Sequence, residues 1–88
     1  MKLIIAILSE HDTETVLKSL MARDFRATRI ASTGGFLRRG NTTLLIGLES
    51  DRVNSAIELI REACLPPEDK GQRRATVFVV DVARFEQL

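Results

Sequence analysis

An uninterrupted apolar segment, Leu3 to Leu8, opens the chain between polar residues on either side. It is rich in isoleucine, which favours a β-strand, and it is far too short to cross a membrane. A strand without a polar position is typical of one that is covered on both of its faces. No small-residue cleavage site follows the segment. We therefore expect a central strand of a sheet and neither a signal sequence nor a membrane anchor.

The rest of the chain alternates between helical and extended apolar patterns. Two amphipathic helices are predicted, one starting at Asp12 or Thr13 and the other at Ser50 or Asp51. Three further strands are predicted at Phe25–Thr33, Thr42–Leu48 and Ala75–Val82. A tail with one helical turn is predicted at Ala83–Leu88. The order β-α-β-β-α-β predicts an α+β, ferredoxin-like fold in a single domain that spans residues 1–88. Many unrelated functions use this fold, so it does not by itself indicate one.

The charge and cysteine content of the chain argue against several kinds of partner. The 88 residues have a formal net charge of +1, so we expect neither DNA or RNA binding nor insertion into a membrane. One cysteine, Cys64, provides no disulfide within a chain and no cysteine cluster for a metal. The sequence also shows no metal-ligand spacing. We expect a cytoplasmic protein without a metal or other cofactor.

Between Phe25 and Leu48 the chain has no aspartate or glutamate, although acidic residues are common elsewhere. The segment carries hydrogen-bond donors suited to phosphate: Arg26, Thr28, Arg29, Ser32, Thr33, Arg38, Arg39, Asn41, Thr42 and Thr43. Arginine binds phosphate through two parallel hydrogen bonds, and the backbone of Gly34-Gly35 can approach an anion closely. Phe36 follows directly, and its ring can stack on a nucleotide base. These features indicate a ligand that has both phosphate and an aromatic group.

Each of these features also has a purely structural interpretation. Gly34-Gly35 can be a turn between two strands, and Phe36-Leu37 can close a core or a subunit interface. Arg38-Arg39 can be solvated loop charges, and Arg26 and Thr28 can occupy solvated positions on an edge strand. Taken alone, the residues support an anion-binding site without naming the anion.

Catalytic groups are not evident in the sequence. His11 is the only histidine, and it precedes a helix in a polar segment with no acid–base partner nearby. Cys64 falls on the apolar stripe of the second predicted helix, which is typical of a small buried residue rather than a nucleophile. We therefore expect that the chain is not an enzyme.

The run from Phe25 to Thr43, FRATRIASTGGFLRRGNTT, resembles the signature of the bacterial cyclic-di-AMP receptor family of PII-like signal-transduction proteins. Met1–Ile7 and Ala75–Val80 are similar to the first and last strands of that family. The resemblance implies a ferredoxin-like homotrimer with one cyclic di-AMP molecule in each cleft between subunits. It also implies a non-enzymatic role, in which the ligand changes binding to a downstream protein partner.

The resemblance also implies which residues contact the ligand. Carried over position by position, they are Arg26, Thr28, Gly35, Phe36, Leu37, Asn41, Gly47, Phe78 and Gln87. Arg26 and Thr28 would act from the second strand, and Phe36 and Leu37 would contact the base. Gly47 would let a strand backbone approach the ligand without a side chain between them.

The chain departs from the family pattern at three places. The segment Leu65–Arg74 is much shorter than the family's long loop, and Arg73-Arg74 replaces a glycine pair before the last strand. Asp24 stands where an amide is common, and a carboxylate near phosphate weakens anion binding. These departures leave two alternatives open: a PII-like sensor of another adenine nucleotide, and a trimeric interaction protein without a ligand.

Overall fold

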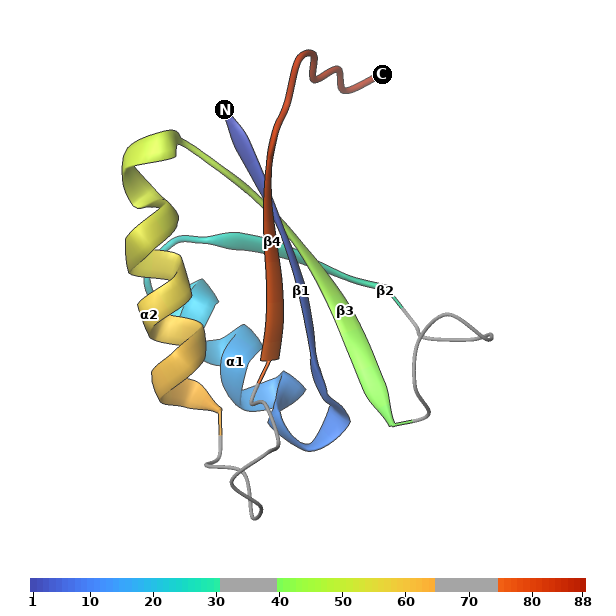
Figure 1. The fold of residues 1–88 in the computed structure, drawn as a ribbon, viewed down its shortest axis with the longest axis vertical. Coiled ribbons are helices and arrows are strands. Elements are labelled where there is room, and N and C mark those ends of the chain that lie inside the picture. Colours follow the sequence, from blue (N-terminus) through green and yellow to red (C-terminus); the bar gives the residue numbers. More distant parts are fainter. Residues whose placement is uncertain (31–39, 65–74) are drawn as a thin grey trace.

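Figure 1 shows a computed structural model of the chain, which describes residues 1–30, 40–64 and 75–88. Its strands form one antiparallel sheet and are β1 (Lys2–Ser9), β2 (Arg26–Ile30), β3 (Asn41–Leu48) and β4 (Ala75–Asp81). Its helices are α1 (Glu10–Ala22), the short 3-10 helix η1 (Ser50–Arg52) and α2 (Val53–Ala63). The element order is the predicted β-α-β-β-α-β, and the α+β class is confirmed. The strand order β2-β3-β1-β4 is compatible with a ferredoxin-like fold.

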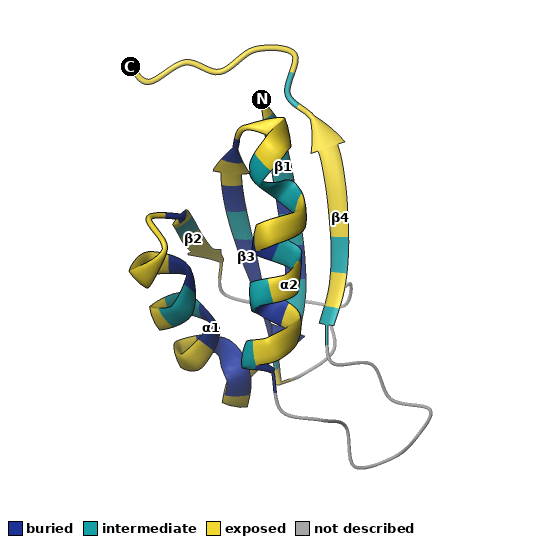
Figure 2. Cartoon of the chain, turned by 90° about the vertical axis from the view of Figure 1, so that its left-hand side faces the viewer, coloured by how far each residue is buried: buried dark blue, intermediate teal, exposed yellow. Residues whose placement is uncertain are grey.

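β1 lies between β3 and β4, so the expectation of a central strand is correct. The residues of β1 that face the helices are fully buried, namely Ile4, Ala6 and Leu8. The alternate apolar residues are only partly buried, namely Leu3, Ile5 and Ile7. α1 and α2 both pack on the same face of the sheet (Figure 2), so within the described residues the helices cover one face of β1 and not both, contrary to the expectation.

The core lies between that face and the two helices. It contains Ile4, Leu8, Val16, Leu20, Leu44, Ile46, Ala56 and Ile60. The apolar stripes of the helices explain why the helices dock there, since burial of these side chains supplies most of the driving force for packing. Cys64 follows α2 and is buried, as the sequence predicts.

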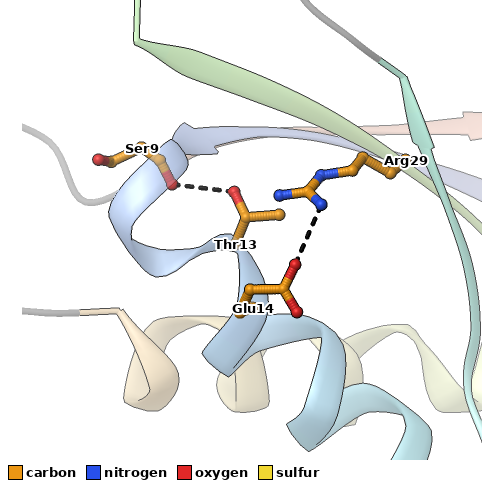
Figure 3. Close-up of polar contacts among 4 residues, drawn as sticks. All are labelled: Ser9, Thr13, Glu14 and Arg29. Atoms are coloured by element: carbon orange, nitrogen blue, oxygen red, sulfur yellow. Dashed lines mark hydrogen bonds and ion pairs between the residues drawn. The ribbon is translucent and has the colours of Figure 1, made fainter.

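α1 follows β1 without a connecting loop, and its start differs from the prediction. Ser9 is the N-cap, and its hydroxyl accepts a hydrogen bond from the backbone N–H of His11 at 3.2 Å. The predicted caps, Asp12 and Thr13, are wrong because both are buried in the first turn of α1. The Thr13 hydroxyl donates instead to the backbone carbonyl of Ser9 at 3.1 Å (Figure 3). This bond ties the first turn of the helix to the end of β1.

The second helix and the C-terminal tail also differ in detail from the prediction. Ser50 and Asp51 lie in the 3-10 turn η1, and α2 begins only at Val53. The backbone N–H of Val82 donates to the Met1 carbonyl at 3.2 Å, after which the chain runs beyond the end of the sheet (Figure 1). Residues 83–88 are exposed and form no helical turn, so that part of the prediction is wrong.

Candidate functional site

The helices leave one face of the sheet open, which we call the outer face. Residues directly opposite each other in an antiparallel pair point to the same face. Ile4 and Ile46 are such a pair and lie beneath the helices, so the alternate positions belong to the outer face. On β2 and β3 these are Arg26, Thr28, Ile30, Asn41, Thr43, Leu45 and Gly47. On β1 and β4 they are Leu3, Ile5, Ile7, Thr76, Phe78 and Val80.

The register brings five of the predicted ligand contacts to this face. One row of paired residues runs Arg26, Gly47, Leu3 and Val80, and the next runs Thr28, Leu45, Ile5 and Phe78. Asn41 lies on the same face at the start of β3, opposite Ser9. Four of these residues, which are far apart in the sequence, thus share two neighbouring rows, and Asn41 lies two rows further along the same face.

The other four predicted contacts are not placed on this face. Gly35, Phe36 and Leu37 lie outside the described residues. Gln87 is exposed in the tail beyond β4, which leaves the sheet of its own chain (Figure 1).

Arg26 and Arg29 lie on opposite faces of β2. Arg29 is on the helix side, where its Nη1 donates to Glu14 Oε1 of α1 at 3.0 Å (Figure 3). Arg26 is exposed on the outer face and makes no ion pair or hydrogen bond with the described part of the chain. An exposed guanidinium without a carboxylate partner is available to bind an anion. The register therefore places Arg26, and not Arg29, on the outer face with the other predicted ligand contacts.

Gly47 lies opposite Arg26 and is exposed. Among the described residues, a Cβ added at Gly47 would meet only the end of the Met1 side chain, whose Cε would lie 3.4 Å away. The flexible end of a methionine side chain can move by a few tenths of an ångström, so packing within the chain does not require glycine here. A strand glycine that internal packing does not require is suited to close approach by an external group.

The outer face divides into a polar half and an apolar half. The β2–β3 half carries the polar side chains Arg26, Thr28, Asn41 and Thr43. The β1–β4 half carries mainly apolar side chains, and Phe78 and Val80 are 52% and 40% exposed. No carboxylate occupies an outer-face position of the four strands. A face of this kind can hold an anion beside a surface that favours burial.

The acidic residue of β4 lies on the other face. Asp81 pairs in register with Lys2, whose ammonium donates to the Asp81 carboxylate. This hydrogen bond, together with the positive charge of Lys2, holds the pKa of Asp81 below its ordinary value of 3.8. Asp81 therefore stays ionised without adding negative charge to the outer face.

The turn between α1 and β2 fixes where β2 begins. Asp24 has a φ of 62°, a left-handed conformation that aspartate tolerates better than most residues. Phe25 follows, is buried, and donates its backbone N–H to the Leu20 carbonyl at 2.9 Å. Arg52 of η1 closes the turn, because its guanidinium carbon lies 4.0 Å from the centre of the Phe25 ring. Its Nη2 also donates to the Arg23 carbonyl at 2.8 Å.

Arg52 is a residue that the sequence did not reveal. Its contact with Phe25 depends on η1 reaching back to the end of α1, and no local spacing in the sequence indicates that approach. The contact acts immediately before Arg26, so Arg52 supports the strand that presents the predicted phosphate donor.

A groove of about 510 Å³ lies between α2 and β4, on the helix side of the sheet. Its lining is Ile57, Ile60, Arg61, Ala75 and Val77. None of the predicted ligand contacts that the structure describes lines it. In the described part of the chain, no group of three or more His, Cys, Asp or Glu residues is placed to hold a metal ion. The helices described here also include none that is long and apolar enough to span a membrane.

The fold and the outer face define a small α+β protein whose sheet presents a polar half and an apolar half on one face. Its family is shown by comparison: the chain belongs to the cyclic-di-AMP receptor family, whose family model matches residues 1–72. The predicted family is therefore confirmed. As a receptor family it points to a binding role rather than to catalysis.

A solved structure of a functionally unknown protein from Pediococcus pentosaceus ATCC 25745 is similar over the full fold. The two chains are 38% identical, with a TM-score of 0.79, and the alignment covers 99% of this chain and 96% of that chain.

Proposed function

We propose that this chain is a non-enzymatic signal-transduction protein that binds cyclic di-AMP in the clefts between the subunits of a homotrimer. Each subunit is one PII-like domain of residues 1–88, and the trimer acts in the bacterial cytoplasm on a downstream protein partner. The family supports the choice of ligand. The observation that carries the proposal is the register that places Arg26, Thr28 and Gly47 together on an open face without a carboxylate.

The ligand is expected to lie over the β2–β3 half of the outer face. Arg26 and Thr28 donate hydrogen bonds to its phosphates, and Gly47 lets the strand backbone approach it closely. Asn41 binds it from the start of β3, and Phe78 contacts it from the far side of the cleft. Gln87 completes the pocket from the tail, which leaves its own sheet and is expected to reach the cleft of a neighbouring subunit.

The homotrimer is supported by the apolar half of the outer face. β1 has the composition of a strand that is covered on both faces, yet one chain covers only one of them. Copies of the chain that pack with their outer faces inward would cover the partly exposed Ile5, Phe78 and Val80. The polar halves would then lie at the borders between neighbouring subunits, where a ligand can contact two of them.

A second candidate is a PII-like sensor of another adenine nucleotide. The short segment Leu65–Arg74 and the pair Arg73-Arg74 favour it, because two added positive charges directly before β4 in the sequence suit a ligand with a different phosphate charge. The same donors and the same open face would then serve a ligand with a different phosphate arrangement.

Isothermal titration calorimetry of the purified protein tests both candidates. Cyclic di-AMP is titrated first, and cyclic di-GMP, ATP and AMP are the comparison ligands. Binding of cyclic di-AMP alone, near one molecule per chain, supports the receptor, whereas binding of ATP alone supports the second candidate. The absence of heat for every ligand at several temperatures would refute both and leave a ligand-free interaction protein.

Two arginine variants then test the site itself. Arg26→Ala is expected to abolish binding while the assembly persists, because it removes the phosphate donor of the outer face. Arg29→Ala is the matched control, since it removes the same side chain from the opposite face of the same strand. Equal affinities for the two variants would refute the assignment of the site to the outer face.

A further inference from the structure

Thr43 combines two properties that no other described residue shares. It is 7% exposed although it lies on the outer face, and its buried hydroxyl oxygen has no hydrogen-bond partner among the described residues. A buried hydroxyl without a partner destabilises a folded protein, because water that it bonded in the unfolded chain is not replaced. When a folded protein retains such a hydroxyl, a ligand that binds to it is one explanation of why the hydroxyl is kept.

The neighbours of Thr43 explain why the chain leaves the hydroxyl without a partner. Its paired residues on the adjacent strands are Ile30 of β2 and Ile7 of β1, and both have apolar side chains. By contrast, the buried hydroxyl of Thr13 donates to the Ser9 carbonyl at 3.1 Å. The described part of the chain therefore provides a hydrogen-bond partner for the buried hydroxyl of Thr13 but not for that of Thr43.

The position of Thr43 relates it to the predicted ligand contacts. Thr28 lies on β2 one row away, and Asn41 lies two residues earlier on the same face of β3. A threonine hydroxyl can donate one hydrogen bond to a phosphate oxygen, which accepts but cannot donate. Thr43 thus extends a line of donors along the β2–β3 half of the outer face.

We propose that Thr43 is a further ligand-binding residue, whose hydroxyl donates a hydrogen bond to a phosphate of the bound nucleotide. The inference rests on the proposed function and adds a contact to the same site. Because the hydroxyl is closed off in the free chain, the contact forms only when its surroundings shift as the nucleotide binds. Binding then supplies the partner that folding leaves out.

The test compares Thr43→Val, which removes the hydroxyl at nearly constant shape, with Thr43→Ser, which keeps it. Calorimetry with cyclic di-AMP should show a Kd raised by about 10- to 100-fold for Thr43→Val, the range for a lost hydrogen bond to a charged group. Thr43→Ser should bind within a few-fold of the unmodified chain. Thr42→Val is the matched control, because Thr42 is buried on the opposite face of β3 and should leave the Kd unchanged.

Thermal unfolding of the variants without ligand gives a second measurement, in which stability and affinity should change in opposite directions. Thr43→Val should unfold no earlier than the unmodified chain, because it removes an unsatisfied hydroxyl, even though it binds more weakly. If Thr43→Val does not fold, the ratio of the Kd values of Thr43→Ala and Thr43→Ser measures the hydroxyl instead. An unchanged Kd without the hydroxyl, or an equal loss in Thr43→Ser, would overturn this role and leave the receptor proposal standing. An unmodified chain that binds no cyclic di-AMP would overturn both.

Discussion

Replacing Phe78 with alanine should dissociate the proposed assembly. Phe78 is half-exposed on the apolar half of the outer face, where a second copy would cover it. A free phenylalanine side chain presents about 200 Å² of surface, so about 100 Å² remains for burial by a neighbouring copy. At about 25 cal/mol per Å², that area contributes about 2.5 kcal/mol for each copy.

In a trimer the three contributions add up to about 7.5 kcal/mol, which corresponds to about five orders of magnitude in the association constant. Sedimentation equilibrium over a range of protein concentrations measures this change directly. The unmodified chain should sediment as a particle of about three times its 9.8 kDa mass, and Phe78→Ala should approach the mass of one chain.

Met21→Ala is the matched control. Met21 is 68% exposed, as an apolar side chain comparable to Phe78, but it lies on α1, on the helix side of the sheet. If the outer face forms the interface, loss of the Met21 side chain should change the association constant much less. The reasoning is refuted if the unmodified chain sediments as a monomer, or if the two variants weaken association equally.

Three further predictions concern stability. Arg52→Ala should lower the free energy of unfolding in urea by about 1–2 kcal/mol, because it removes the cation above Phe25 and the hydrogen bond to the Arg23 carbonyl; a loss no larger than that of Arg52→Lys would contradict the stacking. The pKa of Asp81 is lowered by Lys2 in the folded state, so the pair contributes fully above pH 3.8 and its contribution is lost as the pH falls through the lower folded pKa. Asp81→Asn should remove that part of the pH dependence of unfolding, and an unchanged acid limb would contradict the pairing. Ile46→Ala should cost about 2–5 kcal/mol in chemical denaturation, and a loss below about 1 kcal/mol would contradict its complete burial.

The parts of the fold that the sequence predicts are those with a local periodic signal. The apolar run of β1 predicts a central strand, and β1 lies between β3 and β4. The position of Cys64 on an apolar stripe correctly predicts its burial. In each case the pattern of the residues themselves determines which side faces the core.

The parts that the sequence misses depend on how the elements meet in space. Ser9 caps α1 because β1 runs directly into the helix, which the composition of the segment does not indicate. The apolar run of β1 predicts a strand that is covered on both faces, but it does not indicate that the two helices cover only one of them. The stacking of Arg52 on Phe25 arises only when η1 reaches the end of α1. Tertiary placement, rather than local preference, decides all three.

At Asp24 the side-chain charge can change while the left-handed backbone conformation stays the same. A φ of 62° is readily adopted only by glycine, asparagine and aspartate. Among these residues aspartate alone carries a charge, so exchange with asparagine would leave the path into β2 intact and change only the potential near Arg26. If the proposed site is correct, exchange at this one backbone position changes how strongly the outer face attracts an anion and leaves every predicted ligand contact in place.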